Sequence, residues 1–514
     1  MAGRTRREAR EAREAREARE AREESKSLPL TQEQQDWVDA LLAGKPNFLS
    51  ARAGTGKTST ILAGLKALDR SPGKWSPSMF TLVAFNKENQ LDLQRKAQGT
   101  GAQIATLHSL GFGALRRYNR SLELDSKKIF QLMVEAGFKG KNRRARFSET
   151  MRLVSVAKNW GLGAGLLEDK PDEWIDLADQ YCLHQADLEI AREALERSNK
   201  LAREEGLVDF DDMVYLPLVW KLGLETRAGV IVDEAQDLSP LNLALLKKTP
   251  GKKWYVGDPF QCIYQFRGAR GSGGLGAGLE ELPLTTCWRC DREIIQEARK
   301  WVGDIVARPG APAGEVLHEC RHVDWTREQP GALLARNNED LVDVALALWN
   351  AGRPVYILGR DFGRALLDAL EEIHGDGARL RDGIKDWAEH KADRYPNQAG
   401  HYLALGKVLL AFWNAFKGRK RMETNIGTFF SDQPRPGAWV LSTIHRAKGK
   451  EWDEVWLLDW ERTGSEPWAL EAERNLHYVA ITRARHRLHI VPEPWWQGGA
   501  MGGGALGGGA LKDE

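Results

Sequence analysis

Eight residues, Ala51-Arg52-Ala53-Gly54-Thr55-Gly56-Lys57-Thr58, constrain the fold of this chain more than any other stretch. They match the phosphate-binding loop pattern, with alanine in place of its first glycine. An apolar pair, 48–49, precedes the loop and a helix-like segment, 59–68, follows it, as the pattern requires. Backbone N–H groups of such a loop and the N-terminus of its helix bind anionic oxygens. We therefore expect residues 51–59, Ser59 included, to bind nucleotide phosphates, with Lys57 at the β- and γ-phosphates and the Thr58 hydroxyl on Mg²⁺.

A second motif, Asp233-Glu234-Ala235-Gln236-Asp237, follows the apolar run 230–232. Its carboxylates should emerge at the end of a buried strand, where one can hold a metal ion and another can accept a proton. We expect Asp233 to hold Mg²⁺ and Glu234 to take a proton from water. Together the two motifs predict nucleotide hydrolysis.

The chain has 514 residues, too many for one ordinary core, and so should form several domains. Its 74 Lys and Arg nearly balance 72 Asp and Glu, so the global basic charge of an electrostatic nucleic-acid binder is missing, although a basic groove can coexist with an acidic exterior. Five cysteines, few and odd in number, suit a reducing compartment. Without a membrane-spanning run or a signal-peptide core, we expect a soluble monomer, cytoplasmic if bacterial or phage-type and nuclear if eukaryotic.

Short apolar runs alternate with amphipathic segments along most of the chain, which is typical of parallel α/β architecture. Two stretches, about 118–203 and 360–430, read instead as helical insertions. The first 27 residues repeat Glu-Ala-Arg and predict either a solvated, partly helical tail or a partner-binding arm, and the glycine-rich 496–514 predicts a flexible tail. Strands are predicted at 48–50, 81–85, 229–232, 254–256, 332–335, 354–358, 439–442 and 454–458.

Several further motifs recur in a fixed order. These are Thr31-Gln32-Glu33-Gln34, Ala84-Phe85-Asn86-Lys87, Thr106-Leu107-His108, Gly257-Asp258-Pro259-Phe260-Gln261 with Phe266-Arg267-Gly268-Ala269, Cys287-Trp288-Arg289, Thr443-Ile444-His445-Arg446-Ala447-Lys448-Gly449-Lys450-Glu451, and Tyr478-Val479-Ala480-Ile481-Thr482-Arg483. Through them the chain, from about 30 to about 490, resembles the UvrD/Rep/PcrA-like branch of superfamily 1 helicases.

The resemblance implies an α/β fold of two RecA-like parallel-sheet cores in tandem, each with a helical insertion and with low-complexity tails at both ends. An active site in a cleft between the cores would follow. The implied division of the chain is a tail at 1–27, a first ATP-binding core at 28–115 and 202–285 with an insertion at 116–201, a second core at 286–345 and 437–495 with a reduced insertion at 346–436, and a tail at 496–514.

The same resemblance implies roles in ATP binding and hydrolysis. Gln34 would read adenine, although Thr31 could simply cap a helix that contains it. Trp288, where the family usually has tyrosine, would stack on adenine, and Glu451 would contact the ribose. Gln261 would meet the γ-phosphate or its attacking water, Arg289 the γ-phosphate, and Arg483 would serve as an arginine finger.

Single-stranded DNA would lie against residues from both cores. The positions implied are Phe85, Asn86, His108, Phe266, Thr443 and His445. Stacking on bases suits the two phenylalanines, but Phe85 could equally belong to the core and His108 could be an ordinary partly buried histidine. The acidic run 209–212 resembles the segment that leads back into the first core of this family, but it could only cap a helix.

The implied activity is an ATP-dependent DNA helicase that moves 3′→5′ on single-stranded DNA and unwinds tailed duplexes in replication, repair or recombination, with replication or repair proteins as partners. Alternatives are a translocase that strips proteins from DNA, a 5′→3′ helicase, and a nucleotide-dependent DNA-binding module without enzymatic activity. A zinc site is conceivable at Cys287 and Cys290, with donors at 318, 320 and 322, but the spacing is irregular and Arg289 already has a role.

Overall fold

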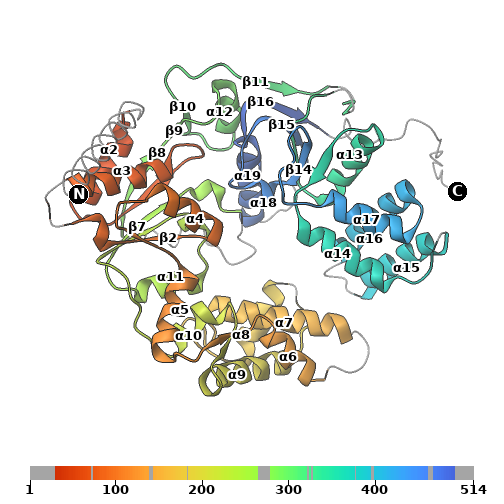
Figure 1. The fold of residues 1–514 in the computed structure, drawn as a ribbon, viewed down its shortest axis with the longest axis horizontal. Helices are drawn as coiled ribbons and strands as arrows, with labels where there is room; N and C mark the ends of the chain where they lie inside the picture. Colours follow the sequence, from red (N-terminus) through yellow and green to blue (C-terminus); the bar gives the residue numbers. More distant parts are fainter. Residues whose placement is uncertain are drawn as a thin grey trace, which may run out of the picture.

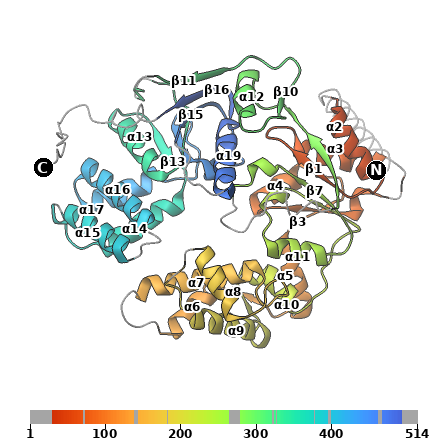
Figure 2. The ribbon, with the colours of Figure 1, turned by 180° about the vertical axis from the view of Figure 1, so that it is seen from behind.

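A computed structural model describes residues 29–70, 73, 75–137, 143–181, 183, 185–263, 278–320, 323–325, 328–376, 378–394, 399–460 and 467–492. Both predicted tails, and Phe266, lie outside the described residues. Figure 1 shows two α/β lobes side by side, with one helical part below the first lobe and another beside the second. Figure 2 shows the same arrangement from behind. Within the described part of the chain, no helix has both the length and the apolar character needed to cross a membrane.

The first lobe is built on a six-stranded sheet whose strand pairs are all parallel. Three of its four inner strands are buried along their whole length and the fourth along its last four residues, as is typical of parallel sheets covered on both faces. The carboxyl ends of parallel strands meet at one edge of the sheet, which brings together the ends of β1 (Asn47–Ala51), β6 (Gly229–Val232) and β7 (Lys252–Gly257). In spatial order the strands are β3 (Gln103–Thr106), β2 (Phe80–Ala84), β6 (Gly229–Val232), β7 (Lys252–Gly257), β1 (Asn47–Ala51) and β8 (Glu280–Leu284).

Helices cover both faces of this sheet because successive strand residues point to opposite sides. Phe48 therefore packs into one core cluster and Leu49 into another. The cluster around Leu49 includes residues of α2 (Gln32–Leu42) and α3 (Lys57–Arg70). The cluster around Phe48 includes residues of α5 (Leu107–Tyr118), α10 (Asp212–Val219) and α11 (Pro240–Lys248). The helices of this lobe are α2 (Gln32–Leu42), α3 (Lys57–Arg70), α4 (Lys87–Lys96), α5 (Leu107–Tyr118), α10 (Asp212–Val219) and α11 (Pro240–Lys248), with 3-10 turns at Pro77–Met79, Ala235–Asp237 and Pro259–Gln261.

The first helical part extends the Phe48 cluster away from the sheet. A short parallel pair of strands, β4 (Glu123–Leu124) and β5 (Leu207–Val208), closes its two ends. Between them run α6 (Lys128–Glu135), α7 (Arg143–Trp160), α8 (Pro171–Gln180) and α9 (Leu188–Glu204). Two buried lysines of this part pair with Asp212 of α10: the Nζ atoms of Lys128 and Lys158 each lie 2.7 Å from its carboxylate.

The second lobe contains another six-stranded, all-parallel sheet. The strands are β11 (Glu315–His318), β16 (Ala484–Val491), β15 (Trp452–Leu458), β12 (Ala332–Ala335), β14 (Trp439–Thr443) and β13 (Val355–Ile357) in spatial order, and β9 (Thr286–Cys287) pairs separately with β10 (Val306–Ala307). Its helices are α12 (Arg292–Arg299), α13 (Asn338–Asn350), α18 (Ile444–Ala447) and α19 (Pro467–Ile481).

The second helical part consists of α14 (Arg360–Glu372), α15 (Ala378–Arg394), α16 (Ala399–Phe416) and α17 (Arg419–Phe429). It meets the first helical part where the Gln185 side-chain amide donates to the Arg394 carbonyl at 2.9 Å.

These two parallel sheets confirm the predicted fold class of two α/β cores in tandem. Each predicted strand range overlaps a strand of one of the two six-stranded sheets. Strand β13 pairs with β14 at the edge of the second sheet, so that sheet extends into the range 346–436 that the prediction gives to the insertion. The remaining domain limits stay predictions.

Candidate active site

The phosphate loop connects the end of β1 to the first residue of α3. Gly54 and Gly56 have φ of +68° and +86°, in the left-handed region that favours glycine. Gly54 also lies against the segment after β9, since a Cβ there would come within 2.7 Å of the Arg289 Cβ and 2.8 Å of the Cys287 sulfur. The same segment donates the Trp288 N–H to the Gly54 carbonyl at 2.8 Å. Glycine is therefore required both for the turn and for the close approach.

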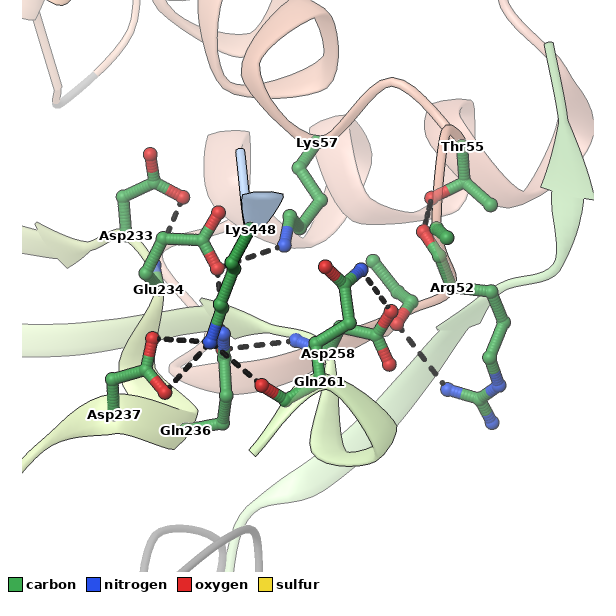
Figure 3. A network of polar contacts seen from close by, with 12 residues as sticks. Arg52, Thr55, Lys57, Asp233, Glu234, Gln236, Asp237, Asp258, Gln261 and Lys448 are labelled. Atoms are coloured by element: carbon green, nitrogen blue, oxygen red, sulfur yellow. Dashed lines mark hydrogen bonds and ion pairs between the residues drawn. The ribbon is translucent and has the colours of Figure 1, made fainter. Parts of the chain in front are cut away.

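Lys57, the first residue of α3, forms an ion pair with Glu234 (Figure 3). Its Nζ lies 3.0 Å from Glu234 Oε2, and Gln236 Nε2 donates to the same oxygen at 2.6 Å. Burial by itself would raise the pKa of Glu234, but the positive charges of Lys57 and Lys448 outweigh burial and bring it to about 2. Glu234 has φ of +51°, rare for a residue with a side chain and typical of functional sites. The carboxylate is thus held ionised, next to the lysine expected to bind phosphates.

Asp233, at the carboxyl end of β6, carries a raised pKa of about 7, caused first by burial and then by the negative charge of Glu234. Its Oδ1 accepts the Glu234 N–H at 3.0 Å. A buried carboxylate of this kind is stabilised in its charged form by a bound cation. With the Thr58 hydroxyl in the first turn of α3, it offers the oxygen ligands that Mg²⁺ prefers, and Mg²⁺ usually completes its shell with phosphate and water. The residues therefore fit the predicted ion.

A lysine of the second lobe contacts the acidic motif 233–237 of the first lobe. Lys448, which follows α18, lies with its Nζ 2.6 Å from Asp237 Oδ2 and donates to the Gln261 carbonyl at 2.6 Å (Figure 3). Burial raises the pKa of Asp237 to about 6 although Lys448 opposes that rise. Both side chains are mostly shielded from solvent, so this ion pair joins the two lobes directly at the site.

Arg483, the predicted arginine finger, lies between the end of α19 and the start of β16 and is 1% exposed. Its guanidinium donates to the carbonyls of Val479 at 2.9 Å and Lys450 at 3.0 Å. A third branch approaches the Gln261 side-chain oxygen at 3.4 Å. Burial lowers its pKa to about 10, still well above neutrality. The structure therefore brings two predicted catalytic residues, from different lobes, into contact.

Glu451, predicted to meet the ribose, forms ion pairs with Arg289 and Arg485. Burial favours its neutral form, but the two arginines together lower its pKa. Arg289 also donates to the Thr482 carbonyl at 3.3 Å. Trp288 is half-buried next to the phosphate loop. Arg289 and Glu451 thus lie together beside the phosphate loop.

Gln34 caps its helix and also lies beside the phosphate loop, and its contact with adenine stays a prediction. Thr31 Oγ1 accepts the Gln34 N–H at 3.2 Å, and the Gln34 side chain accepts the Thr31 N–H at 3.0 Å, a capping box. The Gln34 amide also donates to the Thr55 carbonyl at 3.5 Å, so it lies beside the phosphate loop. Of the remaining loop residues, Ser59 is exposed on α3 and Arg52 forms an ion pair with Asp304 at 2.6 Å.

The predicted DNA contacts that the structure describes occupy strand ends and helix starts in both lobes. Phe85 follows β2 and is 36% exposed, not buried in the core. Asn86 caps α4 by accepting the Asn89 N–H at 2.8 Å. His108 is exposed in the first turn of α5, whereas Thr443 is buried at the end of β14 and His445 is half-buried in α18.

The zinc alternative receives no support. Cys287 and Cys290 are buried, and the Cys290 N–H donates to the Cys287 sulfur at 3.5 Å. Among the residues that the structure describes, no group of three or more His, Cys, Asp or Glu side chains is placed to hold a metal ion. His322 lies outside the described residues.

Four site residues stand inside predicted motifs without having received a role there: Asp237, Asp258, Lys448 and Tyr478. Their burial and mutual contacts depend on how the lobes pack, which the motifs do not reveal. Asp304, the partner of Arg52, belongs to no motif and gave no signal in the sequence.

A parallel sheet with a phosphate loop, completed by cationic side chains from a second sheet, defines a class of two-core nucleotide-binding proteins. Comparison with known proteins identifies the family. Residues 30–275 match the model of the UvrD/REP helicase N-terminal domain, and residues 438–491 match that of the UvrD-like helicase C-terminal domain. The chain belongs to the UvrD/Rep family of superfamily 1 helicases, as the motifs predicted.

Two curated relatives match 90% of the chain at 24% identity. F-box DNA helicase protein 1 of Schizosaccharomyces pombe is matched over 58% of its own length, and DNA helicase IV of Escherichia coli K12 over 68%. Since a chicken F-box DNA helicase 1 is covered over 48%, the chain spans about half the length of the F-box relatives. Among solved structures, the helicase nonstructural protein 10 of an arterivirus aligns with 88% of this chain and 61% of its own at 13% identity, with a TM-score of 0.33.

Proposed function

We propose that this protein is an ATP-dependent DNA helicase that moves 3′→5′ along single-stranded DNA and unwinds duplex, driven by hydrolysis of Mg²⁺-ATP. The observation that carries the proposal is the meeting of both lobes at one set of carboxylates. Lys57 pairs with Glu234 from within the first lobe, while Lys448 reaches Asp237 from the second. A site built from two lobes can couple their relative movement to the state of the nucleotide.

The Lys57 ion pair suggests how binding of ATP would turn Glu234 into a proton acceptor. While Lys57 faces Glu234, the low pKa of this carboxylate makes it a poor proton acceptor. When Lys57 turns to the phosphates, Glu234 loses its main positive neighbour and its pKa rises. The freed carboxylate can then orient a water molecule and accept its proton. Thr58 and Asp233 would hold Mg²⁺, which neutralises charge on the phosphates.

Arginines of the second lobe would supply the remaining transition-state stabilisation. Charge spreads over the γ-phosphoryl oxygens during transfer, so fixed cations stabilise that state more than the ground state. Arg289 lies against the phosphate loop and Arg483 beside Gln261. Their approach closes the lobes, and release of phosphate would let the lobes part. DNA held by Phe85 on one lobe and His445 on the other would then advance stepwise.

The experiment that tests the proposal compares ATP hydrolysis and strand separation in one preparation. Hydrolysis is measured with and without single-stranded DNA, and unwinding on duplexes with a 3′ tail, a 5′ tail or no tail. We expect DNA-stimulated hydrolysis and unwinding of the 3′-tailed duplex. Lys57→Ala should abolish both, while Lys66→Ala, at an exposed position of the same helix, should leave both unchanged.

Other outcomes would identify the alternatives. Preference for the 5′ tail would reverse the polarity. DNA-stimulated hydrolysis without strand separation, together with displacement of a protein bound to the DNA, would identify a translocase. DNA binding that depends on nucleotide without hydrolysis would identify a binding module. Equal use of an RNA strand would change the substrate. Roles in replication, repair or recombination, with protein partners of those processes, are the settings we propose.

A further inference from the structure

Tyr478 in α19 of the second lobe contacts the phosphate loop of the first. Its side chain is 0% exposed, and its hydroxyl oxygen accepts the backbone N–H of Ala53 at 2.7 Å. Backbone N–H groups of a phosphate loop are the groups that bind phosphate oxygens. A side chain from the second lobe therefore binds one of these donors.

The Tyr478 hydroxyl donates to Asp258 Oδ2 in a long contact of 3.5 Å. Asp258 follows β7 and is fully buried. The same Oδ2 accepts the side-chain N–H of Gln261 at 2.6 Å. Burial raises the pKa of Tyr478 well above its ordinary value, and the negative charge of Asp258 adds to that rise. The hydroxyl thus stays protonated and can accept from Ala53 while donating toward Asp258.

The backbone carbonyl of Tyr478 connects, through Thr482, to the predicted arginine finger. Its carbonyl accepts the Thr482 hydroxyl at 2.8 Å, and the Thr482 Oγ1 accepts from Arg483 at 3.2 Å. Arg483 in turn approaches the Gln261 side-chain oxygen at 3.4 Å. Because Gln261 donates to Asp258, the contacts form a closed ring through Tyr478, Asp258, Gln261, Arg483 and Thr482, with Ala53 attached at the tyrosine hydroxyl.

We propose that Tyr478 is a positioning residue that couples occupancy of the phosphate loop to the alignment of Gln261 and Arg483. The inference rests on the proposed ATP hydrolysis and assigns a role to a residue of that same site. A phosphate oxygen arriving at the loop competes for the Ala53 N–H and frees the hydroxyl to bond Asp258 more closely. That shift passes to Gln261 through their shared carboxylate oxygen, and α19 moves with it.

The minimal test is Tyr478→Phe, which removes one oxygen and leaves the ring in place. We expect kcat for DNA-stimulated ATP hydrolysis to fall by about 3- to 10-fold, the effect of one hydrogen bond. The Kd for a fluorescent ATP analogue should change less than twofold, since the loop keeps its other donors. The combination with Gln261→Ala should cost less than the product of the two single effects, because both act through one network.

Tyr215→Phe is the matched control. Tyr215 is also a buried tyrosine, and its hydroxyl donates to the Leu162 carbonyl at 2.7 Å in the first helical part. Similar losses of melting temperature in the two variants, with kcat lowered only in Tyr478→Phe, would support the assignment. Three outcomes would overturn the assignment of Tyr478 without affecting the proposed function: an unchanged kcat, weaker nucleotide binding with normal kcat, or fully multiplicative effects with Gln261→Ala. Absence of hydrolysis by the wild-type protein would overturn the proposed function and this assignment with it.

Discussion

The Lys448 ammonium lies 2.6 Å from Asp237 Oδ2, which joins the second lobe to the acidic motif of the first. The same ammonium donates to the Gln261 carbonyl at 2.6 Å. Asp237 is three residues from Glu234, so one cation of the second lobe fixes both the acidic motif and the predicted γ-phosphate residue. Lys448 also contributes, after Lys57, to lowering the pKa of Glu234.

Removal of Lys448 should therefore slow hydrolysis and shift its pH dependence. Burial already brings the pKa of Asp237 to about 6, and without the lysine this pKa should rise further. We expect Lys448→Ala to lower kcat by about tenfold or more, as for lost hydrogen bonds to a charged group. The acidic limb of the pH–rate profile should move to higher pH. Lys450→Ala, at an exposed neighbouring position, is the control. An unshifted profile would show that the protonation of Asp237 does not set the acidic limb.

The interior of the fold could be predicted from sequence because its strands are short apolar runs. In the two six-stranded sheets, the strands missed were β3, β8, β11 and β16. Three of them are sheet edges, where one side of the strand need not be buried and polar residues are tolerated. β8, for example, contains Glu280, Glu281 and Pro283. β16 lies inside its sheet, but it begins with charged residues such as Arg487, which forms ion pairs with neighbouring strands.

The candidate site divides in the same way. Lys57, Asp233 and Glu234 could be predicted because each stands in a local motif at the end of a strand. The pairing of Lys448 with Asp237, and of Arg52 with Asp304, depends on how the lobes and their connecting segments pack. Charged residues carry no local signal for a partner more than two hundred positions away. Motif order predicted the family, and only packing revealed these contacts.

Asp233 should make the stability of the protein depend on pH and on Mg²⁺. Its folded pKa of about 7 exceeds the ordinary value of about 3.9, so between these values the folded state holds a proton that the unfolded chain has lost. Stability without metal should therefore fall as pH rises from about 4 to about 7. Mg²⁺ should offset this loss by replacing the proton.

Thermal melting of the wild type and Asp233→Asn between pH 5 and 8, with and without Mg²⁺-ADP, tests that prediction. We expect the melting temperature of the variant to change less with pH, by a few degrees over this range, since 1 kcal/mol of stability corresponds to about 2–4 °C. Its melting temperature should also respond less to Mg²⁺. Asp172→Asn, at an exposed position of α8, should behave as the wild type. Identical pH profiles for Asp233→Asn and the wild type would refute the assignment of this titration.

Phe85 should contribute to DNA binding more than to folding, because it is 36% exposed at the end of β2. Stacking of one base on an aromatic ring contributes about 1–3 kcal/mol, so Phe85→Ala should weaken binding of single-stranded DNA by roughly 5- to 100-fold. Fluorescence anisotropy with labelled oligonucleotides measures the Kd. Phe130→Ala, at a 50% exposed position of α6, should leave it unchanged. A large loss of melting temperature with normal DNA binding would instead indicate a packing role for Phe85.

Asp212 should be the residue whose loss most weakens the junction between the first sheet and its helical part. Its two carboxylate oxygens receive Lys128 and Lys158, each at 2.7 Å, and all three side chains are almost completely buried. Removing one partner leaves buried charge uncompensated, which costs about 3–5 kcal/mol. Asp212→Ala should therefore lower the melting temperature and reduce hydrogen-exchange protection in α6, α7 and α10. Asp172→Ala, an exposed aspartate of α8, should change stability by less than about 0.5 kcal/mol. Loss of hydrogen-exchange protection evenly across both lobes, or no loss at all, would show that the pairing of Asp212 with the two lysines does not stabilise this junction.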